Sequence, residues 1–587
     1  MDKQEARVLL SLKINGYSNQ RIMAQDCGYS IGTVNRALRG LMDEGMVNSD
    51  YKLTTKAEGI IAKGRPVNAI ILAAGFGMRM VPINHECPKG LLEVNGEPLI
   101  ERIIKQLNEV GVTDISVIVG FMKEQYEYLI DRFGVRLVVN REYASKNNLH
   151  SLRLAADKLG NTYVIPCDIR CKSNPFGKYE LNSWYMVSEL QDDDSMVRIN
   201  RKEELVRVSE GCKGNAMIGV SYISEATAAV LKERLISFDS LGSHDKDFWE
   251  DTLYDGDRFI VDGRVVGAYE AVEINTYEQL RETDSNSNQL KSDAISIIAE
   301  TFKVGYEEIR NITVLKKGMT NRSFLFECRG RKYIMRIPGE GTSRLINRRE
   351  EAQVYSVISG KGICDDIIYI NSDNGYKITE FWENSRVCDA DNEEDLKLCM
   401  NKLRWFHEQK YVVGHEFDLF GKIDFYETLW EGNPSMYRDY KETKEHVLSL
   451  KRYTDSLTRE RCLTHIDAVP DNFMFVDMNG APVLRLIDWE YSGMQDPHLD
   501  IAMFCIYSLY ERPQIDRLID IYFEGNCPEK TRVKIYCYIA AAGLLWSNWC
   551  EYKSRLGVEF GEYSLRQYRY AKDYYKIAQE EMGKCIR

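Results

Sequence analysis

The feature that most constrains the fold is a pair of polar motifs in the C-terminal half. LTHIDAVPDNFMFV carries His465, Asp467 and Asn472, and VLRLIDWEYSG brings Asp488 16 residues after Asn472. This order and spacing of side chains serves kinase-type phosphoryl transfer. Asp467 is predicted to orient and deprotonate a substrate hydroxyl, and Asn472 and Asp488 to hold Mg²⁺. His465 is predicted to be a structural hydrogen-bonding residue.

The segment before these motifs predicts the small lobe of a kinase-like fold. ITVLKKGMTNRSFLFECRGRKYIMRIPG is typical of two strands joined by a polar turn and followed by a third, and the next run is helical. A protein kinase is excluded because the chain lacks the G-x-G-x-x-G loop and an activation segment. Arg336 also stands where the small lobe of a protein kinase has its lysine.

Four stretches in this half, GMTNRSF, MRIPG, LTHIDAVPDNFM and LIDWEYSGMQDPHLDIAMF, resemble the bacterial choline kinases within the aminoglycoside phosphotransferase group. The resemblance spans about 295 to 580 and implies a bilobal enzyme that phosphorylates choline with ATP. It places Asn321 and Ser323 in the loop that holds the nucleotide phosphates, and Arg336 in contact with the ATP phosphates. Glu351 is expected to pair with Arg336, with neighbouring Glu350 as the alternative.

Aromatic residues near the C-terminus suit a quaternary ammonium ligand, which binds to aromatic faces because it cannot donate a hydrogen bond. LLWSNWCEY sets Trp546 and Trp549 three residues apart on one helical face, with Tyr552 a turn further along. Choline kinases carry such a tryptophan pair, so the resemblance implies a choline site there, with Tyr568 on the last helix as a further member. Read alone, the same stripe would be core packing.

In the N-terminal half, AIILAAGFGMRM places two glycines after an apolar strand that begins at Ala69. Successive backbone amides in such a loop form a phosphate cradle. A dinucleotide-binding fingerprint is excluded because the third glycine of G-x-G-x-x-G is missing, and a Walker loop because no G-K-[ST] follows the glycines.

The pattern LAAGxGxR followed by PK resembles the signature of the sugar-phosphate and alcohol-phosphate nucleotidyltransferases. The resemblance implies a Rossmann-like α/β domain. Arg79 and Lys89 would neutralise the triphosphate and the departing pyrophosphate. The residues that would cradle the nucleotide are Ala73, Ala74, Gly75 and Gly77.

YASKNNLHSL and a strand that ends at Asp168 narrow the resemblance to the bacterial CTP:phosphocholine cytidylyltransferases, over essentially all of 67–282. Asp168 would then hold Mg²⁺ on the CTP phosphates, although a strand-end aspartate in a turn is the alternative. The family supplies a second carboxylate in a motif like E-I-D-T, where VEINTYEQL has Asn275, a ligand with less charge. The implied reaction is in-line attack of phosphocholine on the α-phosphorus of CTP, without a covalent enzyme intermediate.

KDFWEDTLY matches an aromatic and acidic stretch of the same family. Trp249 would present an aromatic face, and Glu250 and Asp251 negative charge, to the choline ammonium group. The alternative is that Trp249 is a core residue.

The first 65 residues contain SNQRIMAQDCGYSIGTVNRALRG, which is typical of a helix-turn-helix with a turn at Gly28 and a second helix capped by Ser30. GMVNSDYKLTTKAEGII resembles the wing and closing helix of a winged helix domain. One use is DNA binding, with Arg36 and Arg39 in the major groove beside Thr33 and Asn35. The alternative is docking on a neighbouring domain or another protein.

Length and composition set the remaining bounds. A chain of 587 residues exceeds one hydrophobic core, and we predict a winged helix domain (1–65), a nucleotidyltransferase domain (66–282), a linker (283–293) around TDSNSNQ, and a kinase domain (294–587). Fifteen irregularly spaced cysteines, and no apolar run long enough to span a membrane, indicate a cytoplasmic protein. The net charge of -12 argues against nonspecific nucleic-acid binding by the whole chain.

These features together predict a bifunctional enzyme with Mg²⁺ at both sites. The kinase would make phosphocholine from choline and ATP, and the transferase would couple phosphocholine with CTP to give CDP-choline. The family resemblance alone implies the use of the product, which is the decoration of surface glycopolymers. One alternative is a nucleotide-sugar or CDP-ethanolamine type of transferase fused to a different small-alcohol kinase. Another is a DNA-binding regulator that senses choline metabolites. The sequence leaves the oligomeric state open.

Overall fold

The structure is a computed structural model. It describes residues 1–585 except 194, 196, 201–203, 209–211, 257, 316–320, 340–341, 459, 479–480, 556–557 and 559. The chain divides by its internal contacts into two compact units, Met1–Ile295 and Ser296–Arg587. Among the described residues, no helix combines the length and apolar character that a membrane span needs.

The N-terminal part of the first unit is helical, and its helix ends follow the capping signals of the sequence. Its helices are α1 (Lys3–Asn15), α2 (Gln20–Cys27), α3 (Ile31–Asp43) and α4 (Thr55–Lys63). Gly28 ends α2 with a left-handed φ of 69°, and the Ser30 side chain caps α3. The predicted wing is reduced to one antiparallel bridge between Val47 and Leu53.

A large mixed sheet forms the centre of the rest of this unit, with its strands in the order β5-β4-β1-β6-β11-β8-β13-β10-β9. Its strands are β1 (Asn68–Ala73), β4 (Asp114–Val119), β5 (Arg136–Val139), β6 (Thr162–Pro166), β8 (Trp184–Asp192), β9 (Val197–Ile199), β10 (Glu204–Arg207), β11 (Gly214–Ile223), and β13 (Arg258–Val266) with β12 (Tyr254–Asp255) beside it. The strands β5, β4, β1 and β6 run parallel, and β11 is antiparallel to β6.

Strand β1 is apolar from Ala69 to Ala73 because both faces of the sheet are covered there. Ile71 packs on one side with α5 (Leu99–Glu109), whereas Ile70 packs on the other with α7 (Asn148–Arg153) and α8 (Glu225–Asp239). Strand β1 pairs in parallel with β4 on one side and with β6 on the other. The carboxyl ends of β1 and β6 therefore lie together at a topological switch point, where α/β sheets bind ligands.

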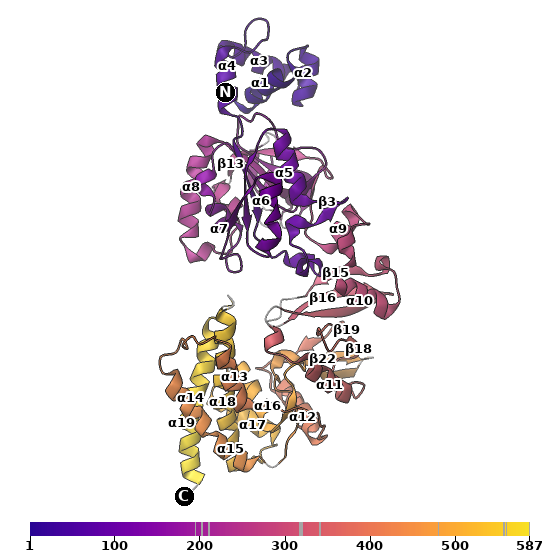
Figure 1. Ribbon diagram of the computed structural model, residues 1–587, viewed down its shortest axis with the longest axis vertical. Helices are drawn as coiled ribbons and strands as arrows, with labels where there is room; N and C mark the ends of the chain where they lie inside the picture. The colour runs from indigo at the N-terminus through magenta and orange to yellow at the C-terminus, as the bar shows by residue number, and fades with distance from the viewer. Residues whose placement is uncertain are drawn as a thin grey trace. The chain divides into compact units, whose positions relative to one another are not determined.

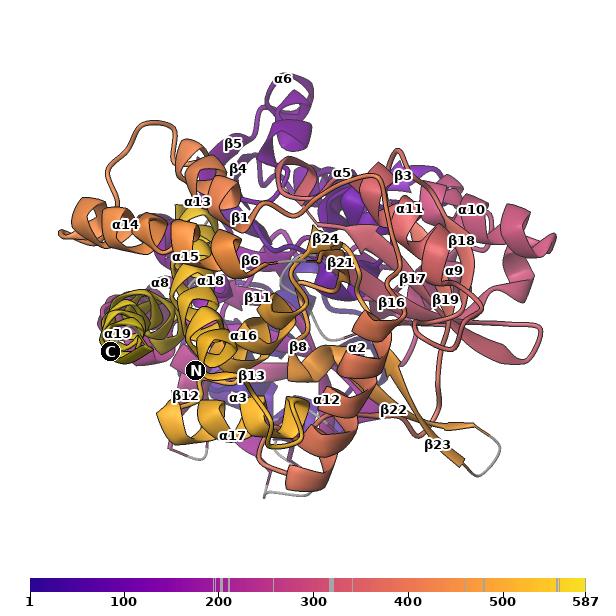
Figure 2. The ribbon, with the colours of Figure 1, turned by 90° about the horizontal axis from the view of Figure 1, so that it is seen from below.

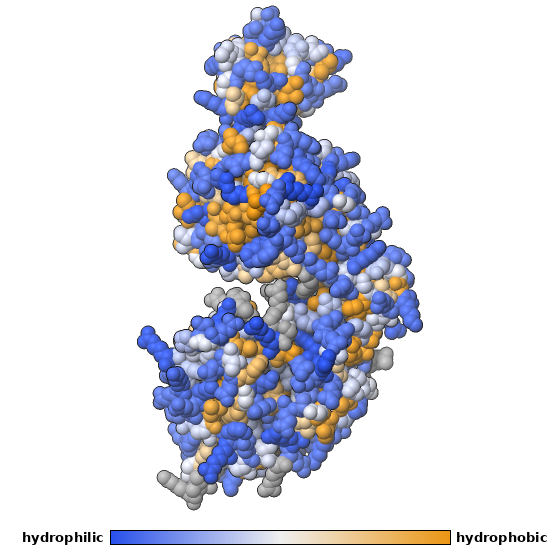
Figure 3. Space-filling model, viewed as in Figure 1, coloured by the Kyte–Doolittle hydropathy of each residue, from blue (hydrophilic) through white to orange (hydrophobic). Residues whose placement is uncertain are grey.

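Short elements complete this unit. They are β2 (Glu93–Val94), β3 (Glu97–Pro98), α6 (Tyr128–Phe133), β7 (Ile169–Cys171), β14 (Ala271–Glu273) and α9 (Tyr277–Thr283). Hydrophobic residues gather on the face drawn in Figure 3 in the region of α6 and α7, and exposed apolar side chains there include Ile130 and Leu154.

The segment predicted as a linker is docked on the first unit. The backbone amide of Glu93 donates to the Gln289 side chain at 2.7 Å, and that of Asn95 donates to Asp284 at 2.7 Å. Leu290 is buried. The contact-based division between the units falls later, within α10 (Asp293–Phe302). The polar composition of this segment favours a linker. Composition alone does not predict that its side chains accept hydrogen bonds from backbone amides almost 200 positions earlier in the chain.

The second unit begins with a five-stranded antiparallel sheet in the order β15-β16-β17-β19-β18. Its strands are β15 (Arg310–Val314), β16 (Asn321–Cys328), β17 (Arg331–Pro338), β18 (Ile367–Ile370) and β19 (Lys377–Glu380), with α11 (Arg348–Ile358) between β17 and β18 in the chain. Strands β15, β16 and β17 and helix α11 are the three strands and the helix that the sequence predicts for a small lobe, and β18 and β19 complete the sheet.

The remainder of the second unit is mainly helical. Its helices are α12 (Glu393–Glu408), α13 (Leu419–Thr428), α14 (Tyr440–Ser449), α15 (Lys451–Leu457), α16 (His498–Tyr507), α17 (Arg512–Tyr522), α18 (Glu529–Arg555) and α19 (Glu562–Cys585). Its short strands are β20 (Arg386–Val387), β21 (Cys462–Thr464), β22 (Phe473–Met478), β23 (Ala481–Leu486) and β24 (Gly493–Gln495). Helices α18 and α19 run side by side (Figure 1), and Figure 2 shows the hairpin of β22 and β23. The predicted Mg²⁺ ligands Asn472 and Asp488 flank this hairpin.

Candidate active sites

The first cavity lies at the carboxyl ends of β1 and β6 and has a volume of about 400 Å³. Gly75 is exposed. A Cβ added there would meet no atom within 4 Å, so the space beside this residue is open. Gly77 has a left-handed φ of 61°, and a Cβ there would lie 2.8 Å from the Lys89 side chain. Ala73 and Ala74 are buried where β1 enters the loop.

Oxygen atoms from distant segments converge on the Lys89 ammonium group in this cavity. Its Nζ lies 2.9 Å from Asp168 Oδ2 and 2.5 Å from Asn275 Oδ1. Lys89 follows the glycine loop, Asp168 follows β6, and Asn275 follows β14. The structure thus brings together three residues that the sequence predicted to share a site.

Glu273 is a member of this cavity that sequence reasoning missed. Burial, followed by the nearby Asp168 carboxylate, raises the pKa of Glu273. Arg79 is exposed on the turn after the glycine loop, and its positive charge lowers the pKa of the same carboxyl group. Glu273 stands two residues before Asn275 in VEINTY, and its acidic side chain was the available signal.

Trp249 and Glu250 line the same cavity. Trp249 is only 1% exposed and also packs into the sheet core, so the two alternatives for this residue are compatible. Tyr185 donates to Glu250 Oε1 at 3.1 Å, whereas Glu250 Oε2 has no hydrogen-bond partner among the described residues. Burial, as the main cause, raises the pKa of Glu250 to about 7.

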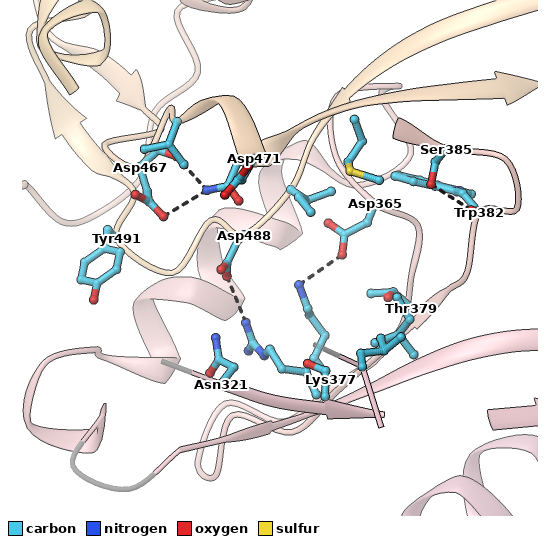
Figure 4. A pocket seen from close by; sticks show the side chains of 18 of the residues that line it. Asn321, Asp365, Lys377, Thr379, Trp382, Ser385, Asp467, Asp471, Asp488 and Tyr491 are labelled. Carbon is cyan, nitrogen blue, oxygen red and sulfur yellow. Dashed lines mark hydrogen bonds and ion pairs between the residues drawn. The ribbon is translucent and has the colours of Figure 1, made fainter. Parts of the chain in front are cut away.

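The second cavity, of about 440 Å³, lies within the second unit between the small sheet and the catalytic motifs (Figure 4). The Asn472 side chain donates to Asp467 Oδ2 at 3.0 Å and to the Asp467 carbonyl at 2.8 Å. Burial, followed by the charge of Glu490, raises the pKa of Asp467 to about 7. A carboxyl group with this pKa can accept a proton near neutral pH.

Asp488 faces the same cavity from the end of β23, with a left-handed φ of 66°. Burial and the charge of Glu490 raise its pKa, while Arg336 opposes the shift from 3.7 Å. His465 Nε2 donates a hydrogen bond to the Ile487 carbonyl, 3.0 Å away. Its contact is therefore with the backbone that leads to Asp488.

Arg336 pairs with Glu351 and not with Glu350. The two bonds of this bidentate pair are 2.5 and 2.9 Å long, and Glu351 is 1% exposed. Arg348 continues the network at 2.9 Å from Glu351 and 3.0 Å from Glu490. Sequence reasoning missed the contact between Arg348 and Glu490 because the two residues lie 142 positions apart in the chain.

Asn321 and Ser323 line the cavity, but from strand β16 and not from a loop. Their backbones pair with β17, where Ser323 lies opposite Arg336. Asn321 also donates to Glu490 at 2.9 Å. The first three residues of GMTNRSF, 318–320, lie outside the described residues.

The predicted choline residues divide into two groups. Trp546 and Trp549 line the cavity with ring centroids 5.4 Å apart, and Tyr491 packs edge-on against Trp546 at 5.6 Å. Tyr552 and Tyr568 are buried and do not line it, so this part of the prediction was wrong. Each three-residue step on α18 turns the side chain by about 60°, which carries Tyr552 away from Trp546.

Tyr568 lies in a separate aromatic contact. Its ring stacks on Tyr437 at 3.8 Å, and its hydroxyl group bonds with Asp439 and Thr443. Sequence reasoning missed five other aromatic residues in the cavity wall, which are Phe381, Trp382, Tyr491, Tyr507 and Tyr563. Tyr491 belongs to the quoted VLRLIDWEYSG, so its proximity to Asp488 in sequence was a usable signal.

Comparison with known proteins gives a match for each half of the chain. Residues 69–179 match the MobA-like NTP transferase domain, and residues 312–568 match the choline/ethanolamine kinase family. The choline-phosphate cytidylyltransferase of Streptococcus pneumoniae is 34% identical over 243 residues, which is 38% of this chain and 100% of that protein. The chain belongs to the choline-phosphate cytidylyltransferase family.

This family assignment applies to the first unit, and a choline kinase domain is fused to it. A 2-aminoethylphosphonate cytidylyltransferase of Lancefieldella rimae is 37% identical over 201 residues, covering 32% of this chain and 78% of that protein. The crystal structure of the choline kinase LicA from Streptococcus pneumoniae is 28% identical, covers 49% of this chain and 100% of that chain, and gives a TM-score of 0.42.

Proposed function

We propose that this protein makes CDP-choline in two steps, with phosphocholine as the shared intermediate. The observation that carries the proposal is that one chain joins both domains and that the polar residues predicted for each reaction line a cavity. We place the catalytic domains at 66–282 and 294–587 and the enzyme in the cytoplasm, where ATP and CTP are available. Decoration of a surface glycopolymer is the proposed use of the product.

In the kinase step, Asp467 accepts the proton of the choline hydroxyl group as that oxygen attacks the γ-phosphorus of ATP. Asn472 holds the Asp467 carboxylate in place. Trp546, Trp549 and Tyr491 surround the trimethylammonium group, which their aromatic faces bind. ADP leaves with the charge of the broken bond on its terminal phosphate.

In the transferase step, a phosphocholine oxygen attacks the α-phosphorus of CTP, and pyrophosphate leaves. Amides of the Gly75 to Gly77 loop hold the nucleotide phosphates, and Lys89 and Arg79 neutralise the charge on the departing group. Trp249 and Glu250 bind the ammonium group, since Glu250 Oε2 has no other described partner.

The residues present suit Mg²⁺ at both sites, although no group of three acidic, histidine or cysteine side chains among the described residues could hold a metal by itself. Asp168 and Asn275 already direct oxygens at one cation, the Lys89 ammonium group. In the kinase cavity, Asp488 and Asn472 supply the oxygens. Mg²⁺ binds through one or two such side chains and the substrate phosphates, whose charge it neutralises.

We expect Glu250→Gln to raise the KM for phosphocholine about 10-fold at pH 8, since a buried charge partner is lost. Because the pKa of Glu250 is raised to about 7, the wild-type KM should fall as pH rises through 7 and the carboxylate ionises. The variant should lack this dependence. Asp251→Asn is the control, and an equal effect there would contradict the role of Glu250.

We expect Trp546→Ala to raise the KM for choline about 10-fold, through the lost cation–π contact, with a smaller effect on the KM for ATP. Tyr568→Phe removes a hydroxyl group outside the cavity and should leave the KM for choline unchanged. Initial rates at varied choline concentration measure both. If Tyr568→Phe raised the KM for choline more than Trp546→Ala does, Tyr568 would belong to the choline site.

Substrate panels test the choline assignment against its alternatives. The purified chain is given ATP with choline or ethanolamine, and CTP with phosphocholine, phosphoethanolamine, sugar phosphates or 2-aminoethylphosphonate. The last acceptor is included because one of the similar proteins is named for it. We expect the highest kcat/KM with choline and phosphocholine, and a preference for 2-aminoethylphosphonate would contradict the proposal.

We also propose that residues 1–65 form a winged helix-turn-helix domain that binds DNA. Arg36 and Arg39 are exposed on α3, and neither forms an ion pair with any described residue. Cations of this kind are available for DNA phosphates or base edges. Selection from random duplex DNA should enrich one sequence with the wild type and none with the Arg36→Ala, Arg39→Ala variant. No enrichment with either would favour a protein partner.

A further inference from the structure

The transferase cavity contains more positive side chains than the CTP phosphates use. The cations among the described residues that line it are Arg79, Lys89, Lys146 and Lys246. Arg79 and Lys89 follow the glycine loop and serve the CTP phosphates in the proposed reaction. Phosphocholine brings a further phosphate group, whose negative charge must approach that of CTP. The acceptor phosphate therefore needs a cation of its own, and Lys146 and Lys246 are the candidates.

Lys146 is surrounded by carboxylates. Its ammonium group lies 3.6 Å from Asp239, 3.7 Å from Glu142 and 3.8 Å from Asp245. A phosphate group bound here would meet three negative charges at close range, and these would repel it. Lys146 instead joins the segment before α7 to the end of α8.

Lys246 has a different environment. Its ammonium group donates to the Ser145 carbonyl at 2.8 Å, and it forms no ion pair with any described residue. The nearby Asp247 carboxylate bonds with His244 at 2.6 Å. An ammonium group has three donors, so two remain for a phosphate group. Lys246 is exposed at the cavity wall, where a substrate can reach it.

Hydrogen bonds hold Lys246 in the same loop as the residues proposed for the choline ammonium group. The Asn147 side chain donates to the Lys246 carbonyl at 2.9 Å. Asn148 Oδ1 accepts a hydrogen bond from the Trp249 amide at 2.8 Å. Both bonds come from the segment before α7, which also lines the cavity. This segment therefore fixes the positions of Lys246 and Trp249 together.

The two ends of phosphocholine must bind close to each other. Only two carbon atoms and one oxygen atom separate its nitrogen from its phosphorus. If Trp249 and Glu250 hold the ammonium group, the phosphate group must lie near the same loop, and Lys246 stands three residues before Trp249. A lysine is a compact point charge suited to a phosphate oxygen. The loop thus offers an aromatic face and a carboxylate to one end of the substrate and a cation to the other.

We propose that Lys246 binds the phosphate group of phosphocholine and thereby selects a phosphorylated acceptor. This rests on the proposed transferase function and adds a substrate contact to that site. Lys246 offsets the repulsion between the acceptor phosphate and the CTP phosphates as the two approach. The acceptor oxygen still forms the new bond to the α-phosphorus, and pyrophosphate still leaves. Lys246 itself forms no covalent bond and takes no proton.

The test compares ligands with and without the phosphate group, using the full chain with Lys246→Met. Initial rates of pyrophosphate release from CTP and phosphocholine give the KM for each substrate. Choline, which lacks the phosphate group, is added as a competing ligand. We expect Lys246→Met to raise the KM for phosphocholine about 10-fold, and to change the KM for CTP and the inhibition constant of choline less than about twofold. Lys246→Arg should recover part of the loss because it keeps the charge.

Lys213→Met is the matched control. Lys213 is also an exposed lysine of the first unit, but it pairs with Asp193 at 2.7 Å and does not line the cavity. We expect its loss to leave all three constants unchanged. Phosphorylation of choline by the same preparations, measured with ATP, reports that the second unit is intact in each variant.

Two results would overturn the proposal. One is a Lys246→Met chain with the wild-type KM for phosphocholine. The other is an equal weakening of phosphocholine and choline binding, which would mean that Lys246 acts only by holding the loop of Trp249. Failure of the proposed function has a different signature. A wild type that converts phosphoethanolamine and not phosphocholine, with a raised KM for phosphoethanolamine in Lys246→Met, would keep the phosphate contact and reject choline.

Discussion

Asp467→Asn is expected to lower choline-dependent ATP consumption by about 10² to 10⁴-fold, the range for loss of a general base. The substitution keeps the size of the side chain while it removes the carboxylate that accepts the hydroxyl proton. Because the pKa of Asp467 is raised to about 7, wild-type kcat/KM for choline should rise with pH through 7 and then level off. The residual activity of the variant should lack this inflection.

The first unit provides an internal control for this variant. Asp467→Asn should still convert added phosphocholine and CTP to CDP-choline at the wild-type rate, because Asp467 lies in the second unit. Loss of both activities would contradict independent sites. Retention of full kinase activity would mean that another group takes the proton.

Lys89→Met should have the complementary effect. We expect cytidylyl transfer to fall by about 10² to 10³-fold, as it does when one preorganised charge partner of a transition state is lost. Lys89 lies among Asp168, Asn275 and Glu273, so the substitution also leaves buried acidic groups without their cation. Phosphorylation of choline by the same chain should be unchanged.

Lys105→Met is the control for Lys89→Met, since Lys105 pairs with Glu97 on the surface of the same unit. Release of pyrophosphate from CTP and phosphocholine measures both variants. Equal losses would show that the rate responds to any lysine substitution in this unit. A Lys89→Met chain with full transferase activity would contradict the role of the cation in the glycine-loop cavity.

The sequence predicts most of what lies close together in the chain. β1 and its glycine loop, the capped helices α2 and α3, and the Asp467, Asn472 and Asp488 set all follow local spacing or capping rules that hold in the structure. The family resemblances are borne out by the matches to an NTP transferase domain and a choline kinase family. Whether residues 1–65 bind DNA stays a prediction.

Residues whose role depends on tertiary contacts were missed or misplaced. Lys377 reaches the kinase cavity because β19 pairs with β17, and Glu490 contacts Arg348, which lies 142 positions away in the chain. Tyr552 has the residue type and spacing of a choline ligand, but the phase of α18 turns it away from the cavity. Asn321 and Ser323 lie in a strand because β17 pairs with them.

Product identification tests the central claim most directly. The purified chain is incubated with labelled choline and Mg²⁺, and with ATP, CTP, both or neither. Labelled CDP-choline should form only with both nucleotides, phosphocholine alone should form with ATP, and CTP alone should leave choline unchanged. Failure to form labelled CDP-choline with both nucleotides, while added phosphocholine is still converted with CTP, would contradict the proposed two-step function.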